Sequence, residues 1–165
     1  MRRANILHHL VSSPLAVQKL FPNHVLKHIE RAIQESEKQQ SGEIRFAVEA
    51  GLDLRALLVR TTPRDRALQV FSDLRIWDTE ENNGVLIYLL LAERTIEIVA
   101  DRGADRKVGT ARWQEICRGI EQHFVAGQFE RGVLDAITAI TDELAKHYPP
   151  RPNDRNELPD APVRL

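Results

Sequence analysis

The sequence contains a single cysteine, Cys117, among its 165 residues. One thiol cannot form an internal disulfide, and it cannot supply a metal site that needs several cysteines. Lysine and arginine (23) nearly balance aspartate and glutamate (24), so no excess of positive charge favours nucleic acid. No apolar run reaches the roughly 18 residues that are needed to cross a bilayer. We therefore expect no transmembrane segment and no binding of nucleic acid.

The short motifs of nucleophilic catalysis are also missing. The sequence has no Gly-rich phosphate loop, no nucleophile elbow and no HExxH pair. His24 and His28 are one helical turn apart but have no evident third ligand, so we expect ordinary surface histidines there. Cys117 falls on an apolar helical stripe and is expected to be a buried, inert thiol. No nucleophile with a partnered base is therefore predicted.

The amino-terminal segment, residues 1–22, carries an arginine pair and short apolar patches. His8 and His9 interrupt what would be the hydrophobic part of a signal peptide, and no small-residue cleavage site follows cleanly. We expect a short helix in this segment, with Ile6, Leu7 and Leu10 on one face. The expected location is the cytoplasm.

The organising stretch of the chain is the apolar run VLIYLLL at residues 85–91. Seven consecutive apolar residues leave no face for water, so the run predicts a strand that is buried on both sides and central in its sheet. A short turn at 92–95 leads to a second apolar run at 95–100, which predicts an antiparallel hairpin. If Leu91 lies opposite Thr95, then Val85 lies near Asp101 and Asn83 lies near Gly103.

The remaining elements follow from hydrophobic periodicity and caps. A helix is predicted from the cap Asn23 to about residue 40, and a strand over residues 43–50. A crossover helix should begin at Pro63, and further helices are expected after residue 105 with a break at Gly127. The core stripe of the crossover helix is predicted to include Ala67, Leu68, Phe71 and Leu74 or Ile76.

The predicted order of elements is α-β-α-β-β-α-α. A strand, a crossover helix and a second strand form a right-handed βαβ unit, so the first two strands are parallel. This order predicts an α/β fold, a three-layer α/β/α sandwich with a small mixed sheet in which an antiparallel hairpin follows the parallel βαβ unit. The domain division is 1–22 for the amino-terminal segment, 23–148 for the α/β domain and 149–165 for a proline-rich, extended and mobile tail.

This topology gathers polar segments at one edge of the sheet, which we call the rim. The two parallel strands begin at this edge, the hairpin ends there, and the crossover helix delivers residues 77–78 to it. Carboxylate and amide oxygens suit Ca²⁺ or Mg²⁺ better than zinc. The predicted metal ligands are Asp78, Asn82, Asp101 and Asp105. The rest of the predicted ligand-binding rim consists of Glu43, Trp77, Thr79, Asn83, Arg102 and Gly103.

Each of these assignments has a structural alternative. Aspartate and asparagine at strand ends often satisfy nearby backbone groups instead of a metal. Arg102 and Arg106 could clamp a phosphate, although arginines in such a loop more often pair with adjacent acids. Trp77 could stack on a ligand, but at the end of an apolar helical stripe it is expected to cover the core.

Five short motifs carry a resemblance to a known family. They are Gly42-Glu43-Ile44 at the first strand, Trp77, NGVLI at 83–87, EIVADRG at 97–103 and GxFxxGV at 127–133. With these motifs the sequence resembles the TPM-domain family, whose members are often labelled phosphatases. The resemblance covers roughly residues 25–147 and implies an α/β/α sandwich with a site on the rim. Some members have been credited with acid phosphatase activity and calcium binding, which implies Ca²⁺ as a candidate cofactor.

Two positions depart from the family pattern. Asn82 stands where many members have an acidic residue, and Ala111 stands near the place of a common aspartate. Cation affinity follows the charge of the ligands, so these departures predict a weak or degenerate site. The expected function is a binding module whose rim or tail docks a protein partner, such as a membrane protein. The alternative is a metal-assisted hydrolase, in which Ca²⁺ or Mg²⁺ polarises a phosphoryl oxygen and activates water.

Overall fold

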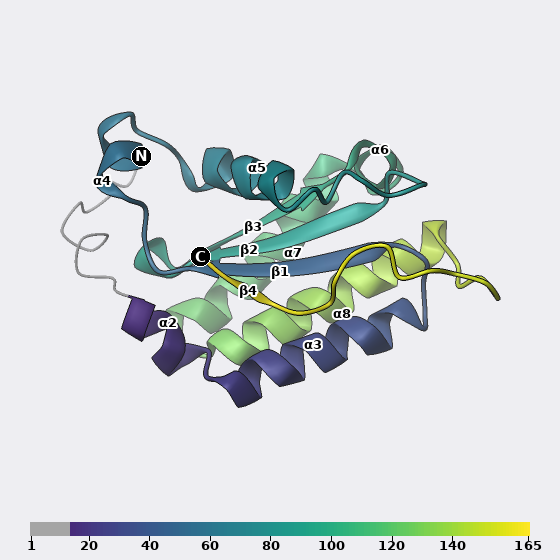
Figure 1. Cartoon of the computed structure of the whole chain (residues 1–165), viewed down its shortest axis with the longest axis horizontal. Coiled ribbons are helices and arrows are strands. Elements are labelled where there is room, and N and C mark those ends of the chain that lie inside the picture. Colours follow the sequence, from purple (N-terminus) through teal and green to yellow (C-terminus); the bar gives the residue numbers. More distant parts are fainter. Residues whose placement is uncertain (1–13) are drawn as a thin grey trace.

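A computed structural model describes residues 14–165, and the predicted helix that contains Ile6, Leu7 and Leu10 lies outside this range. The sheet has four strands in the order β3-β2-β1-β4 (Figure 1). The strands are β1 (Glu43–Glu49), β2 (Gly84–Leu90), β3 (Thr95–Ala100) and β4 (Val163–Arg164). The helices are α2 (Pro14–Leu20), α3 (Asn23–Glu37), α4 (Leu54–Leu58), α5 (Pro63–Asp73), α6 (Arg102–Val108), α7 (Thr110–Val125) and α8 (Phe129–His147), and a 3-10 turn η1 spans Leu91–Glu93.

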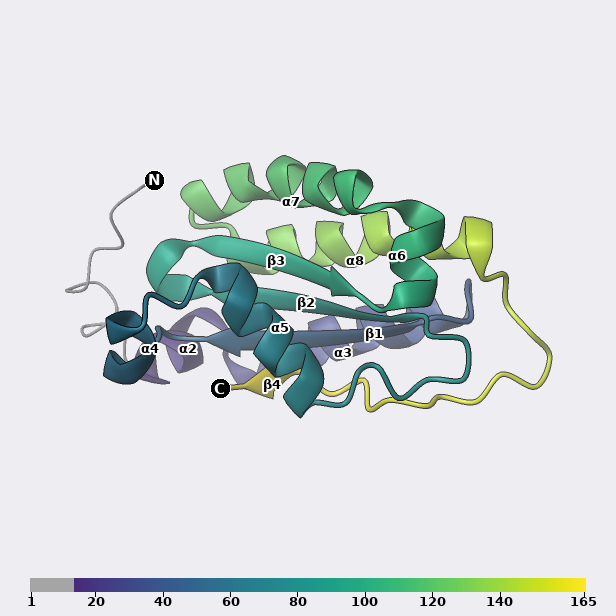
Figure 2. The same ribbon diagram turned by 90° about the horizontal axis from the view of Figure 1, so that it is seen from above.

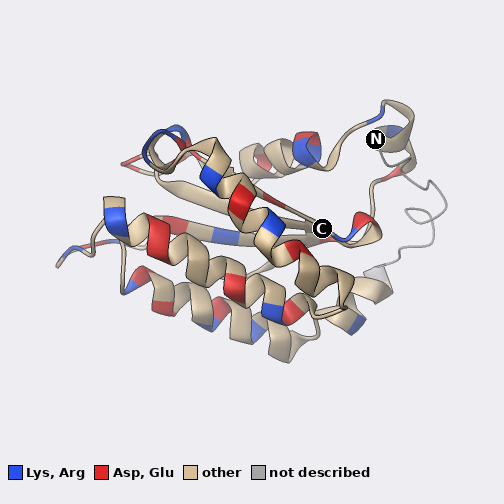
Figure 3. Cartoon of the chain, turned by 180° about the vertical axis from the view of Figure 1, so that it is seen from behind, with Lys and Arg blue, Asp and Glu red and all other residues tan. Residues whose placement is uncertain are grey.

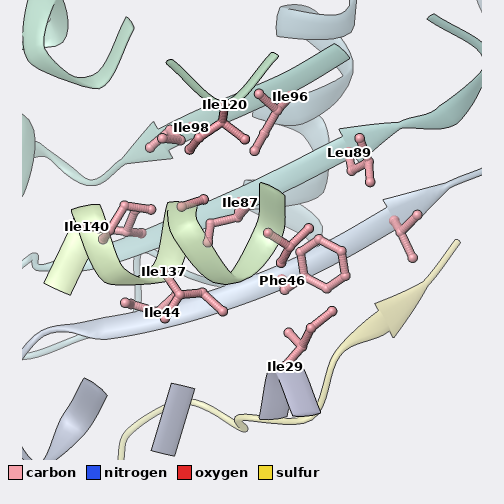
Figure 4. Packing of buried hydrophobic residues seen from close by; sticks show 14 of the residues in the cluster. Ile29, Ile44, Phe46, Ile87, Leu89, Ile96, Ile98, Ile120, Ile137 and Ile140 are labelled. Carbon is pink, nitrogen blue, oxygen red and sulfur yellow. The ribbon is translucent and has the colours of Figure 1, made fainter. Parts of the chain in front are cut away.

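The predicted three-layer α/β/α sandwich is confirmed. Helices α3, α7 and α8 cover one face of the sheet and α5 covers the other, as the two perpendicular views show (Figures 1 and 2). The faces follow the alternation along β1, because Ile44, Phe46 and Val48 pack in the larger core while Ala47 packs under α5. Figure 4 shows the larger core, where Phe46 lies among isoleucines from the strands and from the three helices. Both inner strands, β1 and β2, are buried along almost their whole length.

The hairpin forms as predicted, but its register differs by one residue. Leu90 lies opposite Thr95, and Val85 lies opposite Ala100. The predicted register placed Leu91 opposite Thr95. The difference arises because Leu91 begins the η1 turn, which closes with Arg94 in the left-handed region at φ 50.

Two helix starts show how local chemistry sets the elements. Thr62 caps α5 through a capping box, in which its hydroxyl accepts from the Asp65 amide at 3.1 Å and the Asp65 carboxylate accepts from the Thr62 amide. The prediction that Asn23 caps α3 is wrong, because Asn23 is the first helical residue and Pro22 precedes it. The cap position there has no side-chain hydrogen bond.

The end of α5 was predicted less well than its start. The helix stops at Asp73, and a turn follows it before the rim. Leu68 was predicted to be in the core but is 47% exposed, while Val70 is buried in its place. Trp77 is 46% exposed and does not cover the core as predicted. The apolar stripe of α5 is therefore narrower than the sequence indicated, since only Ala67 and Val70 of the helix are buried.

Helix α6 was not predicted at all. Residues 101–105 were predicted to belong to the rim, and further helices were predicted only after residue 105. In the structure Asp101 caps α6 by accepting a hydrogen bond from the Arg102 amide at 2.7 Å. Gly109, at φ 90, then separates α6 from α7.

The tail is extended, and it also adds a strand that the sequence did not predict. Val163 and Arg164 pair with Ala47 and Val48, so β4 runs parallel to β1 along its outer edge. In Figures 1 and 2 the tail passes around the rim and returns beside β1. Two paired residues form too short a pattern for this strand to be predicted from the sequence.

The surface carries charges of both signs (Figure 3), as the nearly equal numbers of basic and acidic residues predict. Positive and negative side chains are interspersed along the helices that face the viewer in Figure 3. Within residues 14–165, no helix combines the length and the apolar character that crossing a membrane requires.

Candidate functional site

The rim exists as a physical edge, because the two predicted polar segments meet there. The Asp101 amide donates to the Gly84 carbonyl at 2.8 Å, and the Ala104 amide donates to the Asn82 carbonyl at 3.1 Å. A Cβ atom on Gly103 would lie 2.5 Å from the carbonyl oxygens of both Glu81 and Asn82. Glycine is therefore required at position 103 for this close approach.

Asn83 holds the start of β2 against the start of β1. Its side-chain amide donates to the Ser41 carbonyl at 2.7 Å, and its backbone amide donates to the Thr79 hydroxyl at 3.1 Å. The Asn83 side chain is 1% exposed. Its amide oxygen is buried and has no hydrogen-bond partner in the part of the chain that the structure describes. Asn83 and Thr79 thus shape the rim by positioning its backbone.

The four predicted metal ligands do not present a shared set of free oxygens. Asp78 is exposed and pairs with Arg75 at 3.0 Å. Asp105 accepts a hydrogen bond from the Thr110 hydroxyl at 3.1 Å, and one oxygen of Asp101 caps α6. Among residues 14–165, no three His, Cys, Asp or Glu side chains gather closely enough to hold a metal ion. The quartet with Asn82 stays a prediction; local partners occupy Asp78 and Asp105, and one of the two oxygens of Asp101.

Two other members of the predicted rim face solvent. Arg102 is exposed at the first position of α6. The Arg75 guanidinium lies 5.5 Å from the centroid of the exposed Trp77 ring, which is a cation–π contact. The indole therefore packs against a neighbouring cation at the surface.

Sequence reasoning missed a second group of oxygens close to Gly103. One oxygen of Glu81 pairs with Arg151 of the tail, and its other oxygen is buried. That oxygen, the second oxygen of Asp101 and the Tyr148 hydroxyl have no hydrogen-bond partner among the described residues. Burial raises the pKa of Tyr148, and the nearby charges of Glu81 and Asp101 raise it further. The acidic run before β2 was the available signal for Glu81, whereas Tyr148 follows α8 far along the chain.

A cavity of about 670 Å³, partly open to solvent, lies between the rim and the tail. The rim contributes Ser41, Glu80, Glu81 and Asn83, and the tail contributes residues 151–157. Acidic side chains outnumber basic ones in the lining, with Glu80, Glu81, Asp154 and Glu157 against Arg151 and Arg155. The buried oxygens of Ser41, Glu81 and Asn83 that lack partners belong to residues of this wall.

Glu43, predicted as a rim residue, binds the tail through its carboxylate. Its two oxygens accept hydrogen bonds from the consecutive backbone amides of Glu157 at 2.9 Å and Leu158 at 3.2 Å. Burial raises the pKa of Glu43 to about 7, although the two amide hydrogen bonds oppose this shift. Glu43 therefore connects β1 to a segment more than 100 residues away.

Glu37, at the end of α3, lies near the same acidic residues and was not predicted as a site residue. Burial raises its pKa to about 8, and the negative charges of Glu43, Asp160 and Asp154 raise it further. The Asn156 side chain donates to Glu37 at 3.4 Å and to Asp160 at 2.6 Å. A carboxyl group with this pKa is mostly protonated at neutral pH.

The remaining candidates have structural roles. His28 pairs with Glu130 at 2.8 Å, while the rings of His24 and His28 lie edge to face with centroids 6.1 Å apart. Cys117 is partly buried against the larger core, and burial raises its thiol pKa to about 12. A thiol with so high a pKa is a poor nucleophile, because the thiolate is the reactive form.

Comparison with known proteins agrees with this geometry. The profile of the TPM domain matches residues 18–143. The BA42 protein from the psychrophilic bacterium Bizionia argentinensis has a similar NMR structure, with a TM-score of 0.76 and 32% identity over 86% of this chain and 93% of that one. An N-terminal domain of a protein from P. gingivalis shares the fold, with a TM-score of 0.63 and 16% identity over 78% of this chain and 79% of that one. No curated protein matches the sequence.

Proposed function

Because the chain belongs to the TPM domain family, we propose that it is a binding module that takes a divalent cation weakly at the rim. The observation that carries this proposal is the acidic cavity between the rim and the tail. Its wall holds oxygens of Ser41, Glu81 and Asn83 that have no hydrogen-bond partner among the described residues. A buried polar atom without a partner is destabilising, so a ligand that coordinates these oxygens would be favoured.

The expected affinity is low. Carboxylate, amide and hydroxyl oxygens suit Ca²⁺ or Mg²⁺, but tight calcium sites need more negative charge than one carboxylate supplies. Glu81 is also neutralised in part by Arg151. Asp101 is the member of the predicted quartet that keeps a buried oxygen without a hydrogen-bond partner among the described residues. Docking of a protein partner at the rim or the tail stays a prediction.

Thermal unfolding with and without calcium tests the proposal. A ligand that binds only the folded state raises the melting temperature, so millimolar CaCl₂ should raise it by a few degrees. Glu81→Gln should abolish the rise, because it removes the charge that faces the cavity. Glu35→Gln is the matched control, since Glu35 is exposed on α3 and pairs only locally with Lys38. A melting curve that calcium leaves unchanged, or a rise that persists in Glu81→Gln, contradicts a cation site here.

The second candidate is a metal-assisted hydrolase at the same place. It is favoured by one observation, namely that Glu81 and Asp101 each keep an unpartnered oxygen close enough to Tyr148 to raise its pKa. Hydrolysis of p-nitrophenyl phosphate with Ca²⁺ or Mg²⁺ distinguishes the two functions. Activity that requires the cation and is lost in Asp101→Asn would support the hydrolase, and turnover at background level would support the binding module.

A further inference from the structure

The tail, residues 149–165, is held to the body of the protein by a small number of separate contacts. The Tyr148 carbonyl accepts from the Ser41 amide at 2.9 Å, which fixes where the tail leaves α8. Arg151 pairs with Glu81, and Glu43 accepts two amides of the tail. The tail therefore crosses the rim between fixed points, as its path in Figures 1 and 2 shows.

The far end of the tail is bound mainly through its backbone. The Leu165 amide donates to the Val48 carbonyl at 2.9 Å, and Arg45 donates to the Ala161 carbonyl at 3.3 Å. Arg164 reaches the Phe21 carbonyl at 2.7 Å. Leu158 is the buried apolar residue of this segment, at 7% exposure in the smaller core under α5.

These anchors are weak compared with the core that they border. A two-residue strand and one buried leucine remove little apolar surface from water, and such segments open at a lower free energy than the central strands. Several carboxylates also face one another across the contact. They are Glu37 and Glu43 on the body and Asp154, Glu157 and Asp160 on the tail, with Arg45 and Lys38 nearby.

The same tail forms the outer wall of the rim cavity. Residues 151–157 lie across the cavity from Ser41, Glu81 and Asn83, whose unpartnered oxygens are buried. The cavity is already partly open to solvent, so movement of this wall would widen it and expose more of the rim. Release of the tail would remove this wall without breaking the pairing of β1 with β2.

We propose that residues 151–165 form a releasable strap, and that its release widens the rim cavity and exposes the buried polar groups of its wall to ligand. The outer edge of β1, with Glu43 and Arg45, is the dock for this strap and recognises it as an extended peptide through its main chain. The identity of the ligand rests on the proposed cation-binding function. The opening itself does not, and it can be measured with no ligand present.

Cysteine alkylation of the full chain tests the strap. Ser41→Cys places a thiol in the cavity wall, where Ser41 is 5% exposed, and the native Cys117 reports on loosening of the core. Iodoacetamide labelling followed by peptide mass spectrometry gives a separate rate for each thiol. In the Ser41→Cys background, Leu158→Ala should speed alkylation at position 41 by at least about tenfold and leave the rate at Cys117 unchanged.

The matched control is Val125→Ala in the same background, because Val125 is an exposed apolar residue at the end of α7. Arg164→Ala removes an exposed anchor of the tail and should give a smaller increase at position 41. If Leu158→Ala does not fold, Arg164→Ala replaces it as the variant that tests the strap. Equal rates at position 41 in the tail variants and in Val125→Ala, or rates at positions 41 and 117 that rise together, would overturn the strap.

Calcium separates this inference from the proposed function. The calcium test is made by thermal unfolding of the chain that keeps Ser41, because Ser41→Cys removes one of the proposed cation-binding oxygens. Faster labelling at position 41 in the tail variants, with no calcium-induced rise in melting temperature when Ser41 is present, supports the strap and contradicts cation binding at this site. A calcium-induced rise in melting temperature without any acceleration in the tail variants supports the cation site and contradicts the strap.

Discussion

The carboxylate of Glu43 accepts a hydrogen bond from the backbone amide of Glu157 at 2.9 Å, across 114 positions of sequence. This contact joins the first residue of β1 to the carboxy-terminal tail. The second oxygen of Glu43 accepts from the next amide, that of Leu158. Because the buried Glu43 and the partly buried Glu37 have raised pKa values, the contact links the stability of the protein to pH.

The free energy of unfolding should fall as the pH rises from about 4.5 to about 8. Both groups have higher pKa values in the folded protein, about 7 for Glu43 and about 8 for Glu37, than in the unfolded chain, where they are near 4.5. The folded state therefore holds more protons across this window, and the stabilisation present below pH 4.5 is lost as these carboxyls ionise. Urea unfolding at pH 5, 6, 7 and 8 measures the slope.

Glu37→Gln should make this pH dependence shallower, because it removes the group that titrates at the higher pH. Glu35→Gln is the control, since Glu35 is exposed on the same helix and pairs with Lys38. If the slope is the same in both variants, the burial of Glu37 is not the cause of the pH dependence.

Two glycines should respond in opposite directions to alanine. A Cβ on Gly84 would lie 2.1 Å from the Ile76 carbonyl oxygen, so Gly84→Ala must displace backbone and should destabilise the protein by about 3 kcal/mol. Gly119 is exposed in α7 with nothing within 4 Å of its Cβ position, so Gly119→Ala should stabilise by about 0.5 to 1 kcal/mol. Chemical denaturation of both variants provides the comparison, and equal effects would contradict the close approach at Gly84.

The two tryptophans should differ strongly on truncation. Trp113 is 3% exposed in the larger core, so Trp113→Ala should cost about 3 to 5 kcal/mol through lost burial and a cavity. Trp77 is half exposed and contacts Arg75, so Trp77→Ala should cost less than about 1 kcal/mol. Unfolding free energies of similar size in the two variants would be inconsistent with this packing.

Asp101 distinguishes a helix cap from a metal ligand. Asparagine caps helices as well as aspartate, so Asp101→Asn should change the stability by less than about 0.5 kcal/mol, whereas Asp101→Ala should cost about 1 kcal/mol. If Asp101 also binds calcium, any calcium-dependent rise in melting temperature should disappear in Asp101→Asn. A rise that is retained in this variant would assign Asp101 to the cap alone.

The sequence by itself determined the elements whose signals are local. The apolar run at 85–91 has no polar face, which favours a central strand, and its residues 85–90 form one; the alternation of Ile44, Phe46 and Val48 set the faces of β1. The capping box of Thr62 fixed the start of α5. The meeting of the 82–83 and 101–103 segments at the rim also followed, because an antiparallel hairpin brings its two outer ends together.

Only the tertiary structure decided which polar residues of the rim contact the tail. The two-residue strand β4 has no periodicity of its own, and it forms because β1 offers an unpaired edge beside Leu158. The raised pKa values of Glu37 and Glu43 depend on segments more than 100 residues away that bury them, which no window of sequence contains. The exposure of Trp77 was decided in the same way. Its burial depended on where α5 ends and how that end packs on the sheet, not on the apolar character of the indole.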